Sequence, residues 1–364
     1  MRHLTNFLPE LGRQDSSREY VVLVRQSFAE LDVSENVRLE RVPDHVCSSW
    51  VKRIAGDVFE LPRRLTREKF SATVSLTNYG PILSPVPHIL FQRNALHYCP
   101  EYLARISGGL KIEMLLRRRL AVESMKRADL IVTPSNAMAD MIRETCPEVR
   151  ARRFKTLYHG FDSKVLGRCG KVELPLSANG AAPILFYPSH LAEYKGHRLL
   201  FEAVSLLKVD YPRLALILTI GPEDDPKLFA SFQDDLRRLR ITEHVRMVGR
   251  VPQAEIWELY RKSDLMVYPS YCESFGFSML EAMGANLPIV AADTGGNREI
   301  CDGAASYFSP FNAKECADRI CEVLDNASTQ ASLRAAGIRR MATCDWSWRR
   351  YAIEFESILS QLGL

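Results

Sequence analysis

Two glutamates, Glu273 and Glu281, lie eight positions apart on either side of Gly276. Ionised carboxylates accept hydrogen bonds from hydroxyl groups and stabilise positive charge that develops beside them. Glu281 follows Gly276 by five residues, which is about 7.5 Å along a helix that rises 1.5 Å per residue. One acid can therefore contact one part of a hydroxyl-rich ligand while the other contacts a more distant part.

The residues around these acids predict a strand, a loop and a helix. A buried-strand pattern at 264–269 is interrupted at 274–276, and apolar spacing over 279–283 predicts a helix. Glu273 then lies at the carboxyl end of a strand, where open α/β sheets bind ligands. The first free N–H groups of the helix form an anion site beside it. These groups belong to Phe275, Gly276 and Phe277.

A cation is predicted near the same edge. Lys195 follows the strand pattern of residues 184–187 and stands beside Gly196, before a predicted helix at 197–208. A lysine in that place supplies a fixed positive charge for a phosphate. Taken alone, Lys195 is more simply a surface lysine, and the two glutamates are more simply helix-cap carboxylates.

Strand and helix patterns alternate along the chain, which favours parallel sheets covered by helices. The chain opens on an amphipathic helical pattern and closes on another, which contains Trp346, Trp348 and Tyr351. Strands are predicted at residues 20–24, 37–42, 72–76, 88–91, 130–133, 154–157, 184–187, 214–220, 245–248, 265–268 and 289–291.

Further motifs surround the predicted site, and with Glu-x7-Glu they resemble the retaining glycosyltransferases of family 4, which have the GT-B fold. The resemblance covers roughly residues 120–350 well and residues 1–120 only weakly. The motifs are Ala128-Asp-Leu-Ile-Val-Thr-Pro-Ser135, Leu157-Tyr-His-Gly160-Phe-Asp162, Tyr187-Pro-Ser-His-Leu-Ala-Glu-Tyr-Lys195-Gly196-His, Val245-Arg-Met-Val-Gly249-Arg250-Val251, Ile256-Trp-Glu-Leu-Tyr260 and Thr294-Gly-Gly296-Asn-Arg-Glu299.

The resemblance implies two Rossmann-like parallel-sheet domains with a cleft between them. Residues 1–165 would form the acceptor-side domain, 166–182 the linker and 183–345 the nucleotide-sugar domain, and the helix of 346–364 would cross back to the first domain. The family normally begins with a buried strand and a glycine-rich loop. Neither precedes the opening helix here, so the first domain is expected to be incomplete at its amino end.

The implied reaction moves a hexose from a nucleoside diphosphate sugar, with UDP or GDP, to a hydroxyl of a glycan or lipid-linked acceptor. By resemblance, Glu273 would bind sugar hydroxyls and stabilise positive charge at the anomeric carbon. Lys195 would neutralise phosphate charge, and Glu281 would accept from ribose hydroxyls. The base would rest near Arg250 and Val251.

The donor side departs from the family pattern at one position. The family usually has an arginine six residues before the lysine, where this chain has Ser189. The neighbouring His190 can substitute as a donor to phosphate, and the alternative is a packing or capping histidine.

On the acceptor side, the family often places a histidine after the strand at 88–91. Here Arg93 and Asn94 occupy that turn, and His97 follows. Asn94 and His97 are predicted to line the cleft, while the alternative for His97 is a packed loop residue.

Composition describes a globular protein with 46% apolar residues and no apolar run near the roughly 20 residues that span a bilayer. No secretory leader pattern is present, and nine scattered cysteines without a Cys-x-x-Cys pair indicate reduced thiols. We therefore expect a cytoplasmic protein. No Asp-x-Asp motif occurs, so no metal and no cofactor besides the donor substrate are expected.

Charge is distributed unevenly. Residues 1–170 contain 27 Lys plus Arg against 19 acids, a net charge of +8, whereas residues 171–364 contain 21 against 25, a net charge of −4. Much of the surplus lies at Arg117 to Arg119 and at Lys126 and Arg127, on a predicted helix with an apolar stripe. Such a helix can contact an anionic membrane peripherally, or it can be a solvated face over an ordinary core. Nucleic acid is not an expected partner, because no basic and aromatic recognition motif is present.

Two alternatives stay open beside the transferase. A nucleotide-sugar epimerase shares the two-domain shape, and it should show a catalytic acid constellation. A nucleotide-sugar-binding protein without transferase activity is suggested by the missing first strand and by Ser189.

Overall fold

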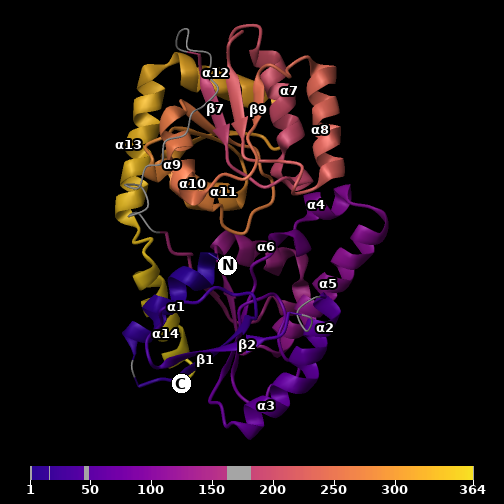
Figure 1. The fold of residues 1–364 in the computed structure, drawn as a ribbon, viewed down its shortest axis with the longest axis vertical. Coiled ribbons are helices and arrows are strands. Elements are labelled where there is room, and N and C mark those ends of the chain that lie inside the picture. The colour runs from indigo at the N-terminus through magenta and orange to yellow at the C-terminus, as the bar shows by residue number, and fades with distance from the viewer. Residues whose placement is uncertain (1, 16, 45–48, 162–181, 364) are drawn as a thin grey trace. The chain divides into compact units, whose positions relative to one another are not determined.

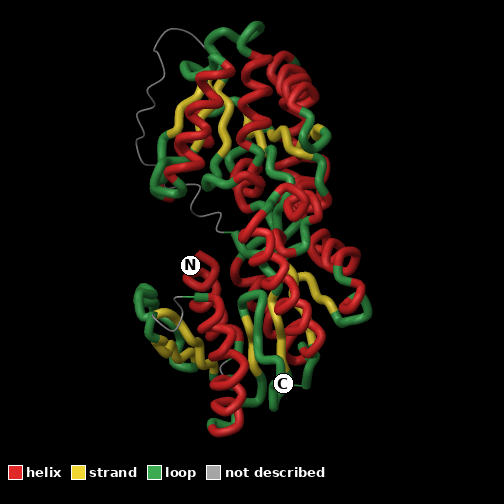
Figure 2. The backbone as a smooth tube through the Cα atoms, turned by 90° about the vertical axis from the view of Figure 1, so that its right-hand side faces the viewer, coloured by secondary structure: helices red, strands yellow, loops and turns green. Residues whose placement is uncertain are grey.

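The computed structural model describes residues 2–15, 17–44, 49–161 and 182–363 (Figure 1). The chain forms two compact units: Met1–Asp162 with Trp346–Leu364, and Ser163–Asp345. Each unit contains parallel strands with helices around them, drawn in yellow and red in Figure 2. Residues 166–181 of the expected linker lie outside the described residues.

The second unit is built on a six-stranded parallel sheet of order β12-β11-β10-β7-β8-β9. The chain enters at β7, adds β8 and β9 on one side, and then adds the other three strands on the other side. The topological switch point therefore lies between β7 and β10, the position where such sheets bind ligands. The strands are β7 (Ile184–Tyr187), β8 (Ala215–Leu218), β9 (Val245–Met247), β10 (Leu265–Tyr268), β11 (Ile289–Ala292) and β12 (Ala305–Phe308).

Five of these strands match predicted ones, and β12 was not predicted. Its sequence Ala-Ser-Tyr-Phe is short and directly follows an Asp-Gly-Ala turn, so it has neither an apolar run nor a clear alternation. Pairing with β11 makes it a strand.

The helices of this unit form two groups. α7 packs against α8 and α12, whereas α10 packs against α11 and α13. Right-handed crossovers place a connecting helix on one face of the sheet when the next strand is added on one side, and on the opposite face when it is added on the other side. The helices are α7 (His197–Leu207), α8 (Pro226–Leu239), α9 (Gln253–Lys262), α10 (Phe277–Gly284), α11 (Gly295–Cys301), α12 (Ala313–Asp325) and α13 (Ala327–Thr343), with short 3-10 turns η5 (Glu193–Lys195) and η6 (Asp302–Ala304).

In the first unit, the described strands form two parallel sheets. One sheet pairs β1 with β2, and the other has the order β3-β4-β5-β6. Each of these strands overlaps a predicted one. They are β1 (Tyr20–Arg25), β2 (Val37–Val42), β3 (Thr73–Ser75), β4 (His88–Phe91), β5 (Leu130–Thr133) and β6 (Phe154–Thr156).

Helices cover both faces of the four-stranded sheet. Ile89 and Phe91 face a core shared with α1 and α14, and Leu90 faces a second core shared with α5 and α6, as the two-residue period of a strand requires. α1 and α14 lie side by side (Figure 1). The helical elements are α1 (Arg2–Gln14), α2 (Trp50–Ala55), η1 (Gly56–Glu60), α3 (Leu61–Arg67), η2 (Ala95–His97), α4 (Pro100–Arg105), α5 (Gly108–Arg127), α6 (Asn136–Thr145), η3 (Pro147–Val149) and α14 (Trp348–Ser360).

Helix α5 differs from the predicted apolar stripe. Met114 is buried, but the four other large apolar residues of its first half are between 46% and 62% exposed. They are Leu110, Ile112, Leu115 and Leu116. No helix in the described part of the chain combines the length and apolar character needed to cross a membrane.

Candidate donor site and acceptor-side loop

The switch point brings the predicted cation and the first predicted acid together. Lys195 ends η5, in the loop after β7, and Glu273 lies in the loop after the neighbouring strand β10. The Lys195 Nζ atom lies 2.6 Å from Glu273 Oε1, and the two side chains are only 10% and 12% exposed. The sequence predicted both residues but not this ion pair.

Neighbouring groups hold the pair in place. The Ser270 hydroxyl donates to Glu273 Oε1 at 2.6 Å, and the Tyr187 hydroxyl donates to the Lys195 carbonyl at 2.9 Å. Gly196 has φ 73°, and a Cβ atom there would lie 2.5 Å from the Pro269 carbonyl oxygen. Only glycine permits this backbone conformation and this close approach of the two loops.

The ionisation of Glu273 follows from this environment. Burial acts to raise the pKa of its carboxyl group, but the Lys195 charge and hydrogen bonds, including those from Lys195 and Ser270, outweigh burial and leave the pKa below its ordinary value. The carboxylate is therefore ionised near neutral pH, as stabilisation of a developing cation requires.

Helix α10 begins beside Glu273. Gly276 is its N-cap residue with φ 90°, and Phe277 is its first residue, so the N–H groups here have no partner within the helix. Glu281 lies in the second turn, is only 4% exposed, and accepts a hydrogen bond of 2.9 Å from the Tyr260 hydroxyl of α9. Phe275, also predicted at this site, is buried.

Ser189, the residue that departs from the family pattern, forms a polar contact with a neighbouring side chain. Ser189 Oγ lies 2.9 Å from Nε2 of the buried His197, and burial is the main reason why the pKa of His197 falls to about 3. His190 is exposed, and its Nε2 lies 2.9 Å from the Tyr194 hydroxyl. Ser189 brings no cation to the site.

The predicted base-binding residues follow β9, the edge strand. The Arg250 side chain is 73% exposed and lies 2.8 Å from Asp224. Its backbone N–H donates to Glu223 Oε1 at 3.2 Å, and Val251 is partly buried. Both predicted residues lie at the carboxyl edge of the same sheet as Lys195, two strands away from β7.

The predicted acceptor-side residues lie in the first unit, after β4. Asn94 Oδ1 caps η2 by accepting from the Leu96 N–H at 3.1 Å, and Asn94 Nδ2 lies 3.4 Å from His97 Nε2. His97 is 1% exposed. Burial, and then the Arg117 charge, lowers the pKa of His97 to about 4. Their functional roles stay predictions.

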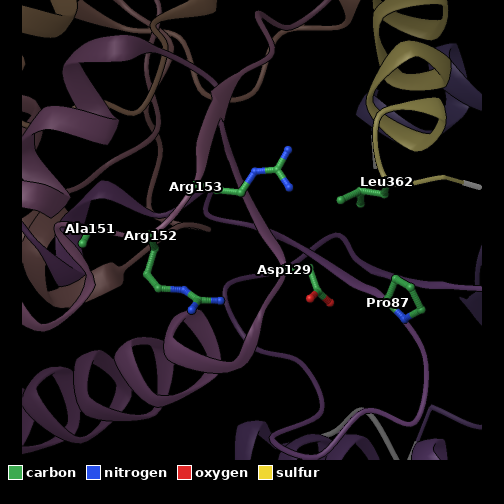
Figure 3. A pocket seen from close by; sticks show the side chains of 6 residues that line it. All are labelled: Pro87, Asp129, Ala151, Arg152, Arg153 and Leu362. Atoms are coloured by element: carbon green, nitrogen blue, oxygen red, sulfur yellow. The ribbon is translucent and has the colours of Figure 1, made fainter.

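A cavity of about 360 Å³ lies at the opposite edge of this sheet (Figure 3). All of its lining residues except Leu362 precede β4, β5 or β6, so it lies at the amino ends of the strands, away from the edge where α/β sheets bind ligands. It is lined by Pro87, Asp129, Ala151, Arg152, Arg153 and Leu362.

Solved structures share this fold. The sucrose-phosphate synthase from Thermosynechococcus elongatus matches with a TM-score of 0.71 and 15% identity, over 98% of this chain and 91% of that one. Anabaena HepE, solved in complex with UDP-glucose, matches with a TM-score of 0.68 and 18% identity, over 90% and 86% of the two chains. The fold is that of the GT-B glycosyltransferases, as the motifs predicted.

Sequence comparisons find similarity to glycosyltransferases. Residues 175–340 match the family described as glycosyl transferases group 1. The D-inositol 3-phosphate glycosyltransferase of Thermobispora bispora is 26% identical over 255 residues, which are 68% of this chain and 57% of the relative. The chain therefore spans little more than half the length of that relative. Over residues 175–340 the chain is similar to the group 1 glycosyltransferases.

Proposed function

We propose that this protein is a retaining glycosyltransferase that moves a hexose from a nucleoside diphosphate sugar to a hydroxyl of a glycan or lipid-linked acceptor. The main support is the placement of Lys195 and Glu273, 2.6 Å apart at the switch point and beside the start of α10. As the bond from the anomeric carbon to the diphosphate breaks, positive charge develops on carbon and negative charge on phosphate. A carboxylate next to an ammonium and the N–H groups at a helix start matches both charges.

The residues divide this work. The diphosphate accepts from the N–H groups at the start of α10 and from Lys195, which exchanges part of its contact with Glu273 for the phosphate. Glu273 then faces the sugar, and its lowered pKa keeps it ionised. Glu281, held by Tyr260, accepts from the ribose hydroxyls. The base rests near Arg250 and Val251.

We favour UDP as the nucleotide, because HepE was solved with UDP-glucose, and we keep GDP as the alternative. Lys195 and the α10 amides provide the positive charge, so we propose that no metal bridges the diphosphate. Transfer should then persist in excess EDTA.

The test is an assay of nucleotide release from UDP-glucose and GDP-glucose, with a glycan and lipid acceptor mixture, in excess EDTA. We expect acceptor-dependent UDP release. Binding of UDP without release would instead support the nucleotide-binding alternative, which the Ser189–His197 contact favours because it leaves this position without a cation. Conversion of the donor hexose without release would support the epimerase. Activity that returns only with added magnesium or manganese would contradict the metal-free site.

We also propose that the protein acts at the cytoplasmic face of an anionic membrane through α5. The outward face of this helix presents Ile112, Leu115 and Leu116, followed by the exposed Arg119. Arg117 contacts Glu113, and Arg118 donates to the Thr145 carbonyl, so these two arginines are already engaged. An exposed apolar face with basic residues suits anionic lipid.

Flotation with anionic vesicles tests this contact. We expect vesicle binding that weakens as the salt concentration rises. The double variant Ile112→Ser/Leu116→Ser should lose this binding. Ile338→Ser is the matched control, because Ile338 of α13 is 55% exposed in the second unit. Equal flotation of the double variant and the control would leave α5 as a solvated face.

A further inference from the structure

Arg93 lies at the carboxyl edge of the four-stranded sheet in the first unit, and its backbone is held firmly. The residue follows the central strand β4. The Asn78 side-chain oxygen, from the loop after β3, accepts from the N–H groups of Arg93 and Asn94 at 2.7 and 3.0 Å. The Gln92 amide donates to the Asn78 carbonyl at 3.0 Å. The arginine is therefore presented from a fixed loop at the edge where parallel sheets bind ligands.

Within the described residues, the Arg93 guanidinium forms no ion pair with a carboxylate. It is partly buried, and burial lowers its pKa. Among the residues that the structure describes, no carboxylate or carbonyl accepts a hydrogen bond from this guanidinium. The buried glutamate of α14, Glu356, is bonded to Arg18 and Tyr20. A desolvated charge without a partner is costly, so native proteins pair it or use it to bind a ligand.

Three groups that interact with Arg93 are neutral near pH 7: His3, His159 and Tyr351. Burial, and then the Arg93 charge, lowers the pKa of His3 and of His159 well below the ordinary value, so both rings are uncharged near neutral pH. His3 Nε2 lies 2.8 Å from the Tyr351 hydroxyl, and the rings of His3 and His159 lie 5.1 Å apart. The buried His3 Nδ1 has no hydrogen-bond partner. If Nε2 accepts from Tyr351, Nδ1 is a second donor without an acceptor.

We infer that Arg93, with His3 beside it, forms a binding site for one oxyanion group, a phosphate or carboxylate, of the acceptor. A guanidinium fork matches both groups with two parallel hydrogen bonds. The site selects a charged acceptor over a neutral glycan. This inference rests on the proposed function, because only a transferase has an acceptor, and it narrows the substrate class to anionic ones.

The test compares Arg93→Gln with Arg67→Gln in the full chain by thermal shift and calorimetry. Arg67 is the matched control, because its side chain is 76% exposed in the same unit. The probes are glucose 6-phosphate, glucuronate, a prenyl phosphate in detergent micelles, and neutral glucose. We expect at least one anionic probe to bind the parent and the control with similar affinity, and Arg93→Gln to bind it at least tenfold more weakly. The probe that responds identifies a soluble sugar phosphate, a uronate or a lipid phosphate as the source.

Two further readouts separate a binding role from a structural one. Without probe, Arg93→Gln should melt at the same temperature as the parent or higher, because a partly buried charge without an ion-pair partner is gone. UDP should shift the melting temperature of every variant equally. A lower melting temperature with unchanged anion binding, or no binding of any anionic probe by a parent that binds UDP, would overturn the inference. Loss of the UDP response in the parent would instead refute the proposed function.

Discussion

The two units each place a cation at the carboxyl edge of a parallel sheet, but they surround it differently. Lys195 in the second unit lies 2.6 Å from Glu273. Arg93 in the first unit has two neutral histidines and a tyrosine as neighbours and no carboxylate partner among the described residues. The first arrangement is balanced before any ligand arrives, whereas the second is balanced only by an anion.

This difference bears on how each site treats its ligand. In the proposed function, a phosphate at Lys195 competes with Glu273, which lowers phosphate affinity but leaves the carboxylate in place for the sugar. An anion at Arg93, as inferred above, would displace no hydrogen-bond partner of this guanidinium among the described residues. The free energy of removing the unpaired charge from water is recovered on binding, which favours discrimination between charged and neutral acceptors.

The largest expected effect is on transfer, after removal of either member of the donor-site pair. Glu273→Gln should abolish detectable transfer while UDP affinity stays within a few-fold, because the carboxylate faces sugar. Lys195→Ala should cost on the order of 3 kcal/mol of barrier, the range of other lost transition-state donors. Steady-state rates and calorimetry measure both effects.

Glu281→Ala provides the contrast, because the lost ribose contact should weaken UDP binding by roughly 1.5–3 kcal/mol. Loss of UDP binding in Glu273→Gln, combined with intact binding in Glu281→Ala, would reverse the two assignments.

A smaller effect is expected from Gly196→Ala. A Cβ atom there would lie 2.5 Å from the Pro269 oxygen, in a backbone conformation with φ 73°, and strain of this kind costs roughly 1–3 kcal/mol. Because Gly196 follows Lys195, transfer should fall along with stability. Gly303→Ala is the control, since a Cβ at Gly303 meets no atom within 4 Å. Denaturant unfolding measures the difference, and equal destabilisation by the two variants would contradict the close approach of the loops.

The smallest expected effect is a difference in acid sensitivity between the units. Burial lowers the pKa of His88 and His97 to about 4 each in the first unit. It lowers the pKa of His3 and His159 there as well, whereas in the second unit burial lowers the pKa of His197 and His190. A histidine with a lowered folded pKa stabilises fully above the unfolded value of 6.5, and this stability is lost as pH falls below 6.5 toward the folded value.

Each such histidine should cost about 1 kcal/mol between pH 6.5 and 5.5. Hydrogen exchange at pH 7.5 and 5.5, corrected for intrinsic rates, should therefore show a greater loss of protection in the first unit. His97→Gln should reduce that loss. Equal losses in both units would show that these histidines do not dominate the acid response.

Local pattern was sufficient to predict most of the framework. Apolar runs located five of the six strands around the donor site, and the glycine before α10 placed Glu273 and Glu281 in a loop and a helix. β12 was missed because its four residues become a strand only by pairing with β11. The GT-B fold and the resemblance to glycosyltransferases were predicted from motifs, because the motifs are short segments that can be found, in their order, directly in the sequence. The roles of the individual site residues stay predictions.

Tertiary structure decided the contacts between distant residues. Lys195 and Glu273 are 78 positions apart, and they meet because β7 and β10 are neighbours at the switch point, which periodicity cannot reveal. Periodicity also could not reveal the hydrogen bonds between Tyr260 and Glu281 and between Ser189 and His197. The helical spacing of the apolar residues in α5 did not indicate which face of the helix would be covered. Arg93 is the clearest example of a property that only the tertiary structure decides. Its residue type was visible in the sequence, but the absence of a described carboxylate beside it depends on where every neighbouring chain segment lies.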